Sequence, residues 1–417
     1  MNALALCAAL LVSKLDVVVS GPGFTSTSAV RRLMSTHEGA AYDPSELERD
    51  LARLRTLGIL YDVSARTADS PTGKVIEVDA RDRWSLLPMF GLRHGGGRTM
   101  ARVGLSDHNA FGRLFTIYGE LTSNADIPFS EGRFGSVIYL EVPRIFGTRF
   151  QPALFWSRDF FDFAAFRDGA PGYIFDRARY DLRFEARYEL LDLVSLMLGA
   201  DARRDRYSAS DISRGPGAIP RSGGTSSALA GVQLGYIEQS VSQLYGRELQ
   251  VQIQASRAGV LGSDFGALSG SLLARGFFLP LPRHNLCLQL LLQATTSGEE
   301  SFLFHAGGLR EIRGFKDSYF TGAVMARANA EWRADVVQGK FVVPFIGQVA
   351  AFADGGYVGG RGGAVSGLDY QGPILSAGVG VRFIPIPFAR AVGRIDVATG
   401  IVPSRTFDVS FSGQQFF

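Results

Sequence analysis

The chain has 417 residues, of which 50 are glycine and 31 are phenylalanine, and charged residues make up 20% of it. Its formal net charge of +3 is too small to indicate binding to nucleic acid or to an acidic membrane surface. The two cysteines, Cys7 and Cys287, suggest neither a disulfide framework nor a metal site. The length fits one large barrel with a small domain, or two or three ordinary domains.

The chain begins with its longest apolar run, at residues 3–12. This run is too short for a transmembrane helix, which needs about 20 residues, but it has the length of a signal-peptide core. No basic segment precedes it and no good small-residue cleavage site follows it. We therefore interpret residues 1–13 as a truncated signal segment in preference to a structural strand.

Residues 14–82 have the pattern of a small α+β domain. A β-branched run at residues 15–20 ends at a Gly-Pro-Gly turn, and residues 25–34 suit a first helix. A second helix follows, and two strands at residues 59–67 and 74–81 complete the domain. The predicted order is β-α-α-β-β.

The second helix carries the clearest local signals. Asp43 is placed as its N-cap and Pro44 as its first residue, while Glu46 completes a capping box. Leucines then recur at helical spacing until Gly58, which is placed to end the helix.

From Trp84 to the end of the chain, the hydrophobic pattern has a period of two. In residues 180–190, aromatic and aliphatic side chains occupy one face, and alternating acidic and basic side chains occupy the other. Such a strand suits a soluble sandwich with one solvated face, or a membrane barrel with a polar lumen. The number of strands separates these alternatives.

About sixteen such runs can be counted, eleven before a glycine-rich interruption and five after it. An even number of amphipathic strands of about ten residues is typical of a closed outer-membrane barrel, because no backbone edge can face lipid. A large soluble sandwich or a propeller is the alternative, and no blade-length repeat supports a propeller. We predict a mainly β fold, with an antiparallel transmembrane barrel of about 16 strands over residues 84–417.

The expected strands cover residues 85–93, 99–108, 113–123, 133–142, 149–160, 173–190, 194–207, 226–239, 246–258, 268–279, 285–296, 321–335, 341–357, 374–384, 390–401 and 405–417.

The interruption, residues 307–320, contains three glycines and five charges, and it reads as a long loop without a strand of its own. Within it lies Ile312-Arg313-Gly314-Phe315, an arginine followed by a permissive glycine and an aromatic side chain. A long loop between strands of a closed sheet is often functional.

This arrangement resembles the BamA/TamA superfamily, outer-membrane proteins that insert or translocate polypeptides. Residues 15–81 resemble a POTRA domain, most specifically in the string LRTLGILYDVSA after the second helix. Near the C-terminus, the strings SAGVGVRF and GRIDVATGI resemble strands that follow the loop in that family. The match to the family's V/I-R-G-F/Y motif is Ile312-Arg313-Gly314-Phe315, which implies that a loop at residues 300–320 folds into the lumen.

The resemblance implies partners for Arg313. A buried guanidinium needs carboxylates, and two are well placed, Glu331 and Asp354. Asp354 belongs to a match to the family's F-x-D-x-G motif, and the period of two places Phe352 on the same lumenal face. The simpler interpretation of Arg313 is an exposed loop arginine.

The C-terminal strand has aromatic residues on one face and resembles the signal by which outer-membrane proteins are recognised for insertion. Phe411, Gly413 and Phe417 are its proposed elements. It is equally the expected closing strand of the barrel, and both interpretations can hold.

The resemblance implies a protein of the bacterial outer membrane, with its POTRA-like domain in the periplasm. Its partners would be the lipid bilayer, unfolded polypeptide clients captured by β-augmentation, and periplasmic or lipoprotein accessory proteins, although only one POTRA-like module precedes the barrel. A weakly paired seam between the first and last strands is implied as well. The alternative is a passive pore or structural anchor, or the C-terminal part of a longer protein.

The sequence gives little support for an enzymatic function. The five histidines are scattered without zinc spacing, and no phosphate-binding loop or phospholipase motif is present. We therefore predict no catalytic residues, no cofactor, no metal and no nucleic-acid partner.

Overall fold

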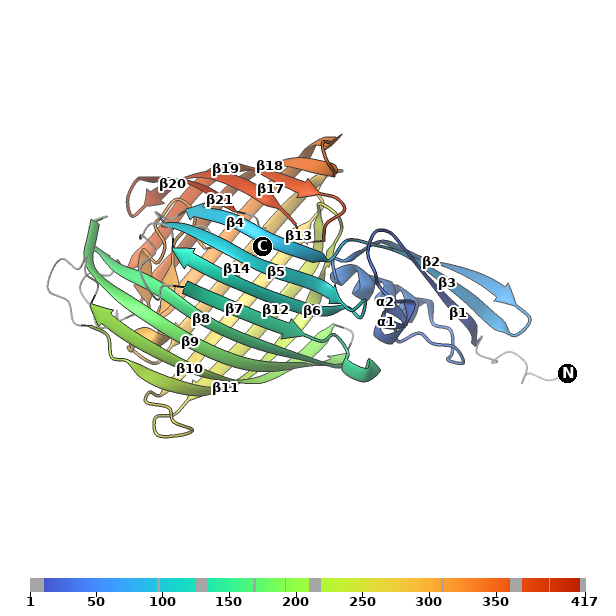
Figure 1. The fold of residues 1–417 in the computed structure, drawn as a ribbon, viewed down its shortest axis with the longest axis horizontal. Helices are drawn as coiled ribbons and strands as arrows, with labels where there is room; N and C mark the ends of the chain where they lie inside the picture. The colour runs from blue at the N-terminus through green and yellow to red at the C-terminus, as the bar shows by residue number, and fades with distance from the viewer. Residues whose placement is uncertain are drawn as a thin grey trace.

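The computed structural model describes residues 11–95, 98–124, 134–167, 170–191, 193–209, 219–308, 311–360, 370–389 and 391–412. The described chain forms a small N-terminal domain attached to one end of a large β-barrel (Figure 1). The first ten residues, which include most of the proposed signal segment, lie outside the described ranges.

The N-terminal domain has the predicted β-α-α-β-β order. Its elements are β1 (Val12–Ser20), α1 (Thr27–Leu33), α2 (Pro44–Thr56), β2 (Leu60–Ser70) and β3 (Gly73–Asp82). The sheet order is β1-β3-β2, with β1 parallel and β2 antiparallel to β3. Strand β1 begins at Val12, three residues before the start expected at Leu15.

The second helix begins as its sequence predicts. Asp43 is the N-cap, and its carboxylate accepts a hydrogen bond from the backbone N–H of Ser45. Pro44 is the first helical residue, and Gly58 follows the helix with a φ of +67°. Leu54 from this helix packs with Ile76 and other buried apolar side chains in the domain's core.

The barrel confirms the predicted fold class. Sixteen described strands form a closed ring, eleven before the loop and five after it. They are β4 (Leu86–Gly95), β5 (Arg98–Ala110), β6 (Phe115–Asn124), β7 (Phe134–Glu141), β8 (Phe150–Arg167), β9 (Ala170–Leu191), β10 (Val194–Ala209), β11 (Gly223–Gln239), β12 (Leu244–Ser256), β13 (Ala267–Phe278), β14 (His284–Thr295), β17 (Val324–Lys340), β18 (Pro344–Gly359), β19 (Gly372–Pro385), β20 (Gly393–Val402) and β21 (Thr406–Ser412).

The period of two separates an apolar exterior from a polar lumen. On β20, Ile395 and Val397 are exposed on the outside, whereas Arg394 and Asp396 are buried on the inside. Strand β9 shows the same alternation, with Leu182 exposed on its outer face. Within the described ranges, no helix is both long and apolar enough to cross a membrane.

The segment between β14 and β17, residues 296–323, is called the lumenal loop below. The described residues between 307 and 319 carry no strand, as predicted, but β15 (Phe304–Ala306) and β16 (Phe320–Gly322) pair on either side of them as a short antiparallel hairpin that was not predicted. The strand expected at 321–335 is therefore split between β16 and β17. Ala323 separates the two strands, and its carbonyl accepts a hydrogen bond from the N–H of Thr295, where the chain returns to the barrel wall.

The N-terminal domain contacts the barrel through its helices, which lie on its barrel-facing side in Figure 1. The N–H of Ser26 donates to the carbonyl of Gly112 at 2.9 Å. Arg144 donates to the carbonyl of Leu33 at 2.9 Å and to the carboxylate of Glu189 on β9. These contacts fix the domain against the rim of the barrel.

Candidate functional site in the barrel lumen

The tip of the lumenal loop lies buried inside the barrel. Ile312, Arg313 and Phe315 are each at most 1% exposed. Gly314 has a φ of +86°, and a Cβ on it would lie 2.8 Å from the backbone nitrogen of Gly400 on β20. Glycine thus allows both the left-handed turn and the close approach of the loop to the wall.

Arg313 binds Asp354 on β18 side-on. Its Nε donates to Asp354 Oδ2 at 2.7 Å and its Nη2 donates to Oδ1 at 2.8 Å, while its backbone N–H also reaches Oδ2 at 3.1 Å. Asn329 on β17 donates to the same carboxylate at 3.0 Å. This bidentate geometry is the strongest arrangement available to an arginine and a carboxylate.

Glu331 on β17 receives three arginines. Arg313 Nη1 donates to its Oε2, Arg333 Nε donates to its Oε1 at 2.7 Å, and Arg382 Nη2 lies 3.2 Å from both oxygens. The side chains of these four residues have no exposed surface. Glu331 therefore joins the loop tip, β17 and β19 at one point.

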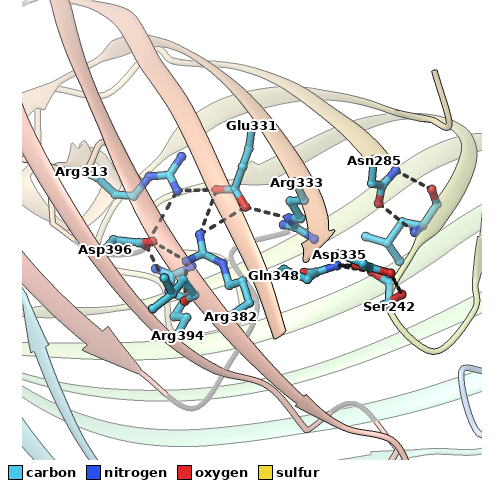
Figure 2. A network of polar contacts seen from close by, with 12 residues as sticks. Ser242, Asn285, Arg313, Glu331, Arg333, Asp335, Gln348, Arg382, Arg394 and Asp396 are labelled. Atoms are coloured by element: carbon cyan, nitrogen blue, oxygen red, sulfur yellow. Dashed lines mark hydrogen bonds and ion pairs between the residues drawn. The ribbon is translucent and has the colours of Figure 1, made fainter. Parts of the chain in front are cut away.

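Asp396 on β20 extends the network to the next strand. Arg382 Nη1 donates to its Oδ1, and Arg394 Nε and Arg313 Nη1 lie 3.5 and 3.8 Å from its Oδ2. Figure 2 shows these arginines and carboxylates converging from adjacent strands. We call Arg313, Glu331, Arg333, Asp354, Arg382, Arg394 and Asp396 together the charge cluster.

Phe352 supports the guanidinium of Arg313 from β18. Its ring centroid lies 3.3 Å from Arg313 Cζ, in a cation–π contact. The side chain is 6% exposed and shares the inner face with Asp354. The position of a phenylalanine on the lumenal side of the barrel is thus explained by the arginine that it packs against.

The structure brings together Arg313, Glu331 and Asp354, the three charged residues singled out from the sequence. Sequence reasoning missed Arg333, Arg382, Arg394 and Asp396. Arg333 could have been found, because it is two residues after Glu331 and therefore on the same face. Arg382 and Asp396 lie in the strings SAGVGVRF and GRIDVATGI, where their charges interrupt otherwise apolar or small residues.

The loop tip also touches the last strand. Thr406 Oγ1 on β21 donates a hydrogen bond to the carbonyl of Gly314. Of the residues proposed as a C-terminal signal, Phe411 lies on β21 with a 37% exposed side chain, whereas Gly413 and Phe417 lie outside the described residues.

A second polar group lies nearer the N-terminal domain. Asp335 accepts hydrogen bonds from Ser242 at 2.8 Å and from Gln348 at 2.6 Å (Figure 2). Asn285 donates to the carbonyls of Leu244 and Phe278, so it fastens neighbouring turns together. These hydrogen bonds connect neighbouring strands and turns, and we assign them a structural role.

At the same end, a cavity of about 800 Å³ lies between the N-terminal domain and the barrel. Arg49 and Arg53 of helix α2 line one side, and barrel side chains such as Glu141 and Glu248 line the other. In the part of the chain that the structure describes, no His, Cys, Asp or Glu side chains are grouped so that they could hold a metal ion.

Both the N-terminal domain and the whole fold are similar to known proteins. Residues 15–81 match the POTRA family model, described as a surface antigen variable number repeat. The fold matches BamA from Haemophilus ducreyi lacking POTRA domains 1–3, with a TM-score of 0.54, 15% identity, and coverage of 97% of this chain and 84% of that one.

Two CdiB structures match as well. CdiB from Escherichia coli gives a TM-score of 0.71 at 14% identity, covering 96% of this chain and 76% of that one. CdiB from Acinetobacter baumannii gives 0.65 at 15% identity, covering 97% and 73%. A comparison with curated protein sequences gave no match. Together, the POTRA match and these structures confirm that the fold resembles that of the BamA/TamA superfamily, as predicted.

Proposed function

We propose that this POTRA-bearing barrel, whose fold is that of BamA and CdiB, inserts or translocates polypeptides at a bacterial outer membrane. Residues 14–82 act as the periplasmic domain and residues 84–417 as the membrane barrel. The substrates are unfolded outer-membrane or secreted polypeptides. Periplasmic or lipoprotein accessory proteins are proposed as further partners.

The observation that carries this proposal is the buried loop tip. A passive pore needs an open lumen, whereas here Arg313 is held inside the barrel by Asp354 and Glu331. Separating a buried arginine from its carboxylates costs several kcal/mol, so the loop stays in place in the resting protein. A lumen obstructed by its own chain suits a gated translocator better than a passive channel.

The N-terminal sheet offers one edge to a client. The outer edge of β1 is partly occupied, because the Val12 N–H donates to the Ala40 carbonyl, the Gly39 N–H donates to the Val12 carbonyl, and the Leu15 N–H donates to Glu38. Strand β2 is the other edge of the sheet, and its residues 64–69 are largely exposed. We propose that an extended client adds to β2 by β-augmentation.

The proposed lateral seam lies between β21 and β4. These strands meet at the registered pair of Phe411 with His94. The contact of Thr406 with the Gly314 carbonyl connects β21 to the loop tip. A change in the position of the loop would therefore reach the strand that closes the barrel.

The test is assisted folding in proteoliposomes. The purified protein is reconstituted, an unfolded outer-membrane barrel precursor is added, and its folding is followed by heat-modifiable migration and protease protection. We expect faster folding than in empty liposomes, and slower folding with Arg313→Ala than with the wild type. Lys316→Ala, an exposed change in the same loop, serves as the matched control and is expected to behave like the wild type.

The passive-pore alternative predicts a different result. The protein would then accelerate the folding of the precursor no more than an unrelated porin-type barrel does, and Arg313→Ala would make no difference. That outcome would remove the proposed function while leaving the described fold intact.

A further inference from the structure

The start of the lumenal loop is held by a second set of contacts, made by residues outside the charge cluster. On the inner wall, Arg179 of β9 faces Asp205 of β10 in direct cross-strand register. Arg179 Nε donates to Asp205 Oδ1 at 2.6 Å and its Nη2 donates to Oδ2 at 2.8 Å. The Asp205 side chain is 1% exposed. Two strands thus present one guanidinium in a fixed orientation.

That guanidinium reaches the loop. Arg179 Nη2 also donates to the backbone carbonyl of Ser301 at 3.2 Å, in the short 3₁₀ helix Glu300–Phe302. The hydroxyl of Tyr207 on β10 lies 3.4 Å from Ser301 Oγ. The loop is therefore bound to the wall by a main-chain and a side-chain contact at the same residue.

Apolar packing adds to this attachment. Phe302 is 7% exposed and packs against Phe265 and Ala267. The guanidinium of Arg203, also on β10, lies 5.1 Å from the centroid of the Phe302 ring. The short helix Glu300–Phe302 is therefore buried on both its polar and its apolar sides, as expected of a stable attachment to the wall.

The ring order of the strands places the two attachments on opposite walls. In the closed ring of sixteen strands, β17, β18 and β20 follow β10 by five, six and eight places. The loop is bound to β9 and β10 near Ser301, and at its tip to β17, β18 and β20 through Arg313. It therefore crosses the lumen from one wall to the other.

We infer that Arg179, oriented by Asp205, is a positioning residue that holds the start of the lumenal loop, so that the loop is a strap fixed independently at two walls. The geometry needs arginine, because one guanidinium must bind both carboxylate oxygens and the Ser301 carbonyl in fixed directions. A lysine at this position keeps the positive charge but cannot donate two parallel hydrogen bonds to the carboxylate. This inference goes beyond the proposed function, because it concerns where the loop is held and not what the protein transports.

Amide hydrogen exchange on the full-length protein in detergent micelles or nanodiscs tests the inference without an activity assay. With Arg179→Lys, we expect amides in residues 297–306 to exchange about tenfold faster, while those in residues 311–320 stay protected. With Arg313→Lys, we expect the reverse pattern. Arg183→Lys changes an arginine four residues along the same inner face, whose carboxylate contacts are longer, and should alter neither segment.

Asp205→Asn provides a second variant in case Arg179→Lys folds poorly, and it should loosen the same segment. The inference is overturned if Arg179→Lys and Asp205→Asn leave residues 297–306 as protected as in the wild type. It is also overturned if either variant releases both segments together, since the loop would then have one attachment only. Both results are independent of client folding, so they are distinguishable from a failure of the proposed function.

Discussion

The N-terminal domain and the barrel lumen bury their side chains by opposite chemistry. In the domain, Leu54, Ile76 and Val78 are fully buried in an apolar core. In the lumen, Glu331 and Asp354 are as completely buried, but among arginines. The core of the domain is held together by the hydrophobic effect, whereas the buried charges of the lumen are held by ion pairs, beside an apolar cluster that includes Ile312 and Phe315.

The difference lies in how each region responds to damage. Removing atoms from an apolar core leaves a cavity whose cost varies with how far the surroundings collapse. Removing one member of the charge cluster leaves its partners charged, buried and uncompensated. Since Arg313 is the loop's member of the charge cluster, the contribution of that cluster to holding the loop tip depends on one side chain.

The largest effect should follow Arg313→Ala. The change removes the guanidinium that binds Asp354 and one of the three arginines that contact Glu331. Breaking a buried ion pair of this kind costs about 3–5 kcal/mol. We expect the temperature at which the barrel loses its heat-modifiable migration to fall clearly. Lys316→Ala should leave it unchanged, and an equal fall in both variants would contradict the special place of Arg313.

Leu54→Ala tests the apolar side of the comparison. Leu54 is 0% exposed, so the truncation should destabilise the N-terminal domain by about 2–5 kcal/mol. Limited proteolysis should show faster cleavage of the domain while the heat-modifiable migration of the barrel is kept. Val18→Ala, at a side chain 46% exposed in the same domain, is the control and should have little effect. Loss of the barrel's migration with Leu54→Ala would show that the two regions are not separable.

Gly314→Ala sharpens the comparison at the backbone. A methyl group there meets the backbone of β20 and forces an alanine to a φ of +86°, and such strain costs about 1–3 kcal/mol. Gly39→Ala is a close match, with a φ of +84° and no atom within 4 Å of its added Cβ. In thermal melting, Gly314→Ala should lose more stability than Gly39→Ala. Equal losses of stability would mean that the close approach to Gly400 is unimportant.

Thr406→Val should have the smallest effect. It removes the hydroxyl that binds the Gly314 carbonyl, a hydrogen bond worth about 0.5–1.5 kcal/mol. We expect the amides of β21 to exchange faster, while Thr406→Ser, which keeps the hydroxyl, should retain their protection. If the serine variant exchanged as fast as the valine variant, the methyl group and not the hydrogen bond would connect the loop to β21.

Local patterns account for what the sequence predicted well. The period of two gave the sixteen strands, and the signals at Asp43, Pro44 and Gly58 gave the second helix of the N-terminal domain. Arg313 could be matched with Glu331 and Asp354 because a motif marked the arginine and both acids follow closely on successive strands. The same reasoning placed Phe352 on the lumenal side.

Contacts between distant segments could not be predicted in this way. Arg382 lies 51 residues from Glu331, and Arg179 lies 122 residues from Ser301, so neither pair leaves a local pattern. The β15–β16 hairpin was missed because strands of three residues are too short to show a period. These features depend on which strands become neighbours or face each other once the barrel closes.

Planar-bilayer recording tests most directly whether Arg313 keeps the lumenal loop inside the barrel. The account predicts a small, flickering conductance for the wild-type protein. It predicts a clearly larger conductance after deletion of residues 307–320, and an increase in the same direction for Arg313→Ala. A steady, large conductance in the wild type that neither change alters would contradict it.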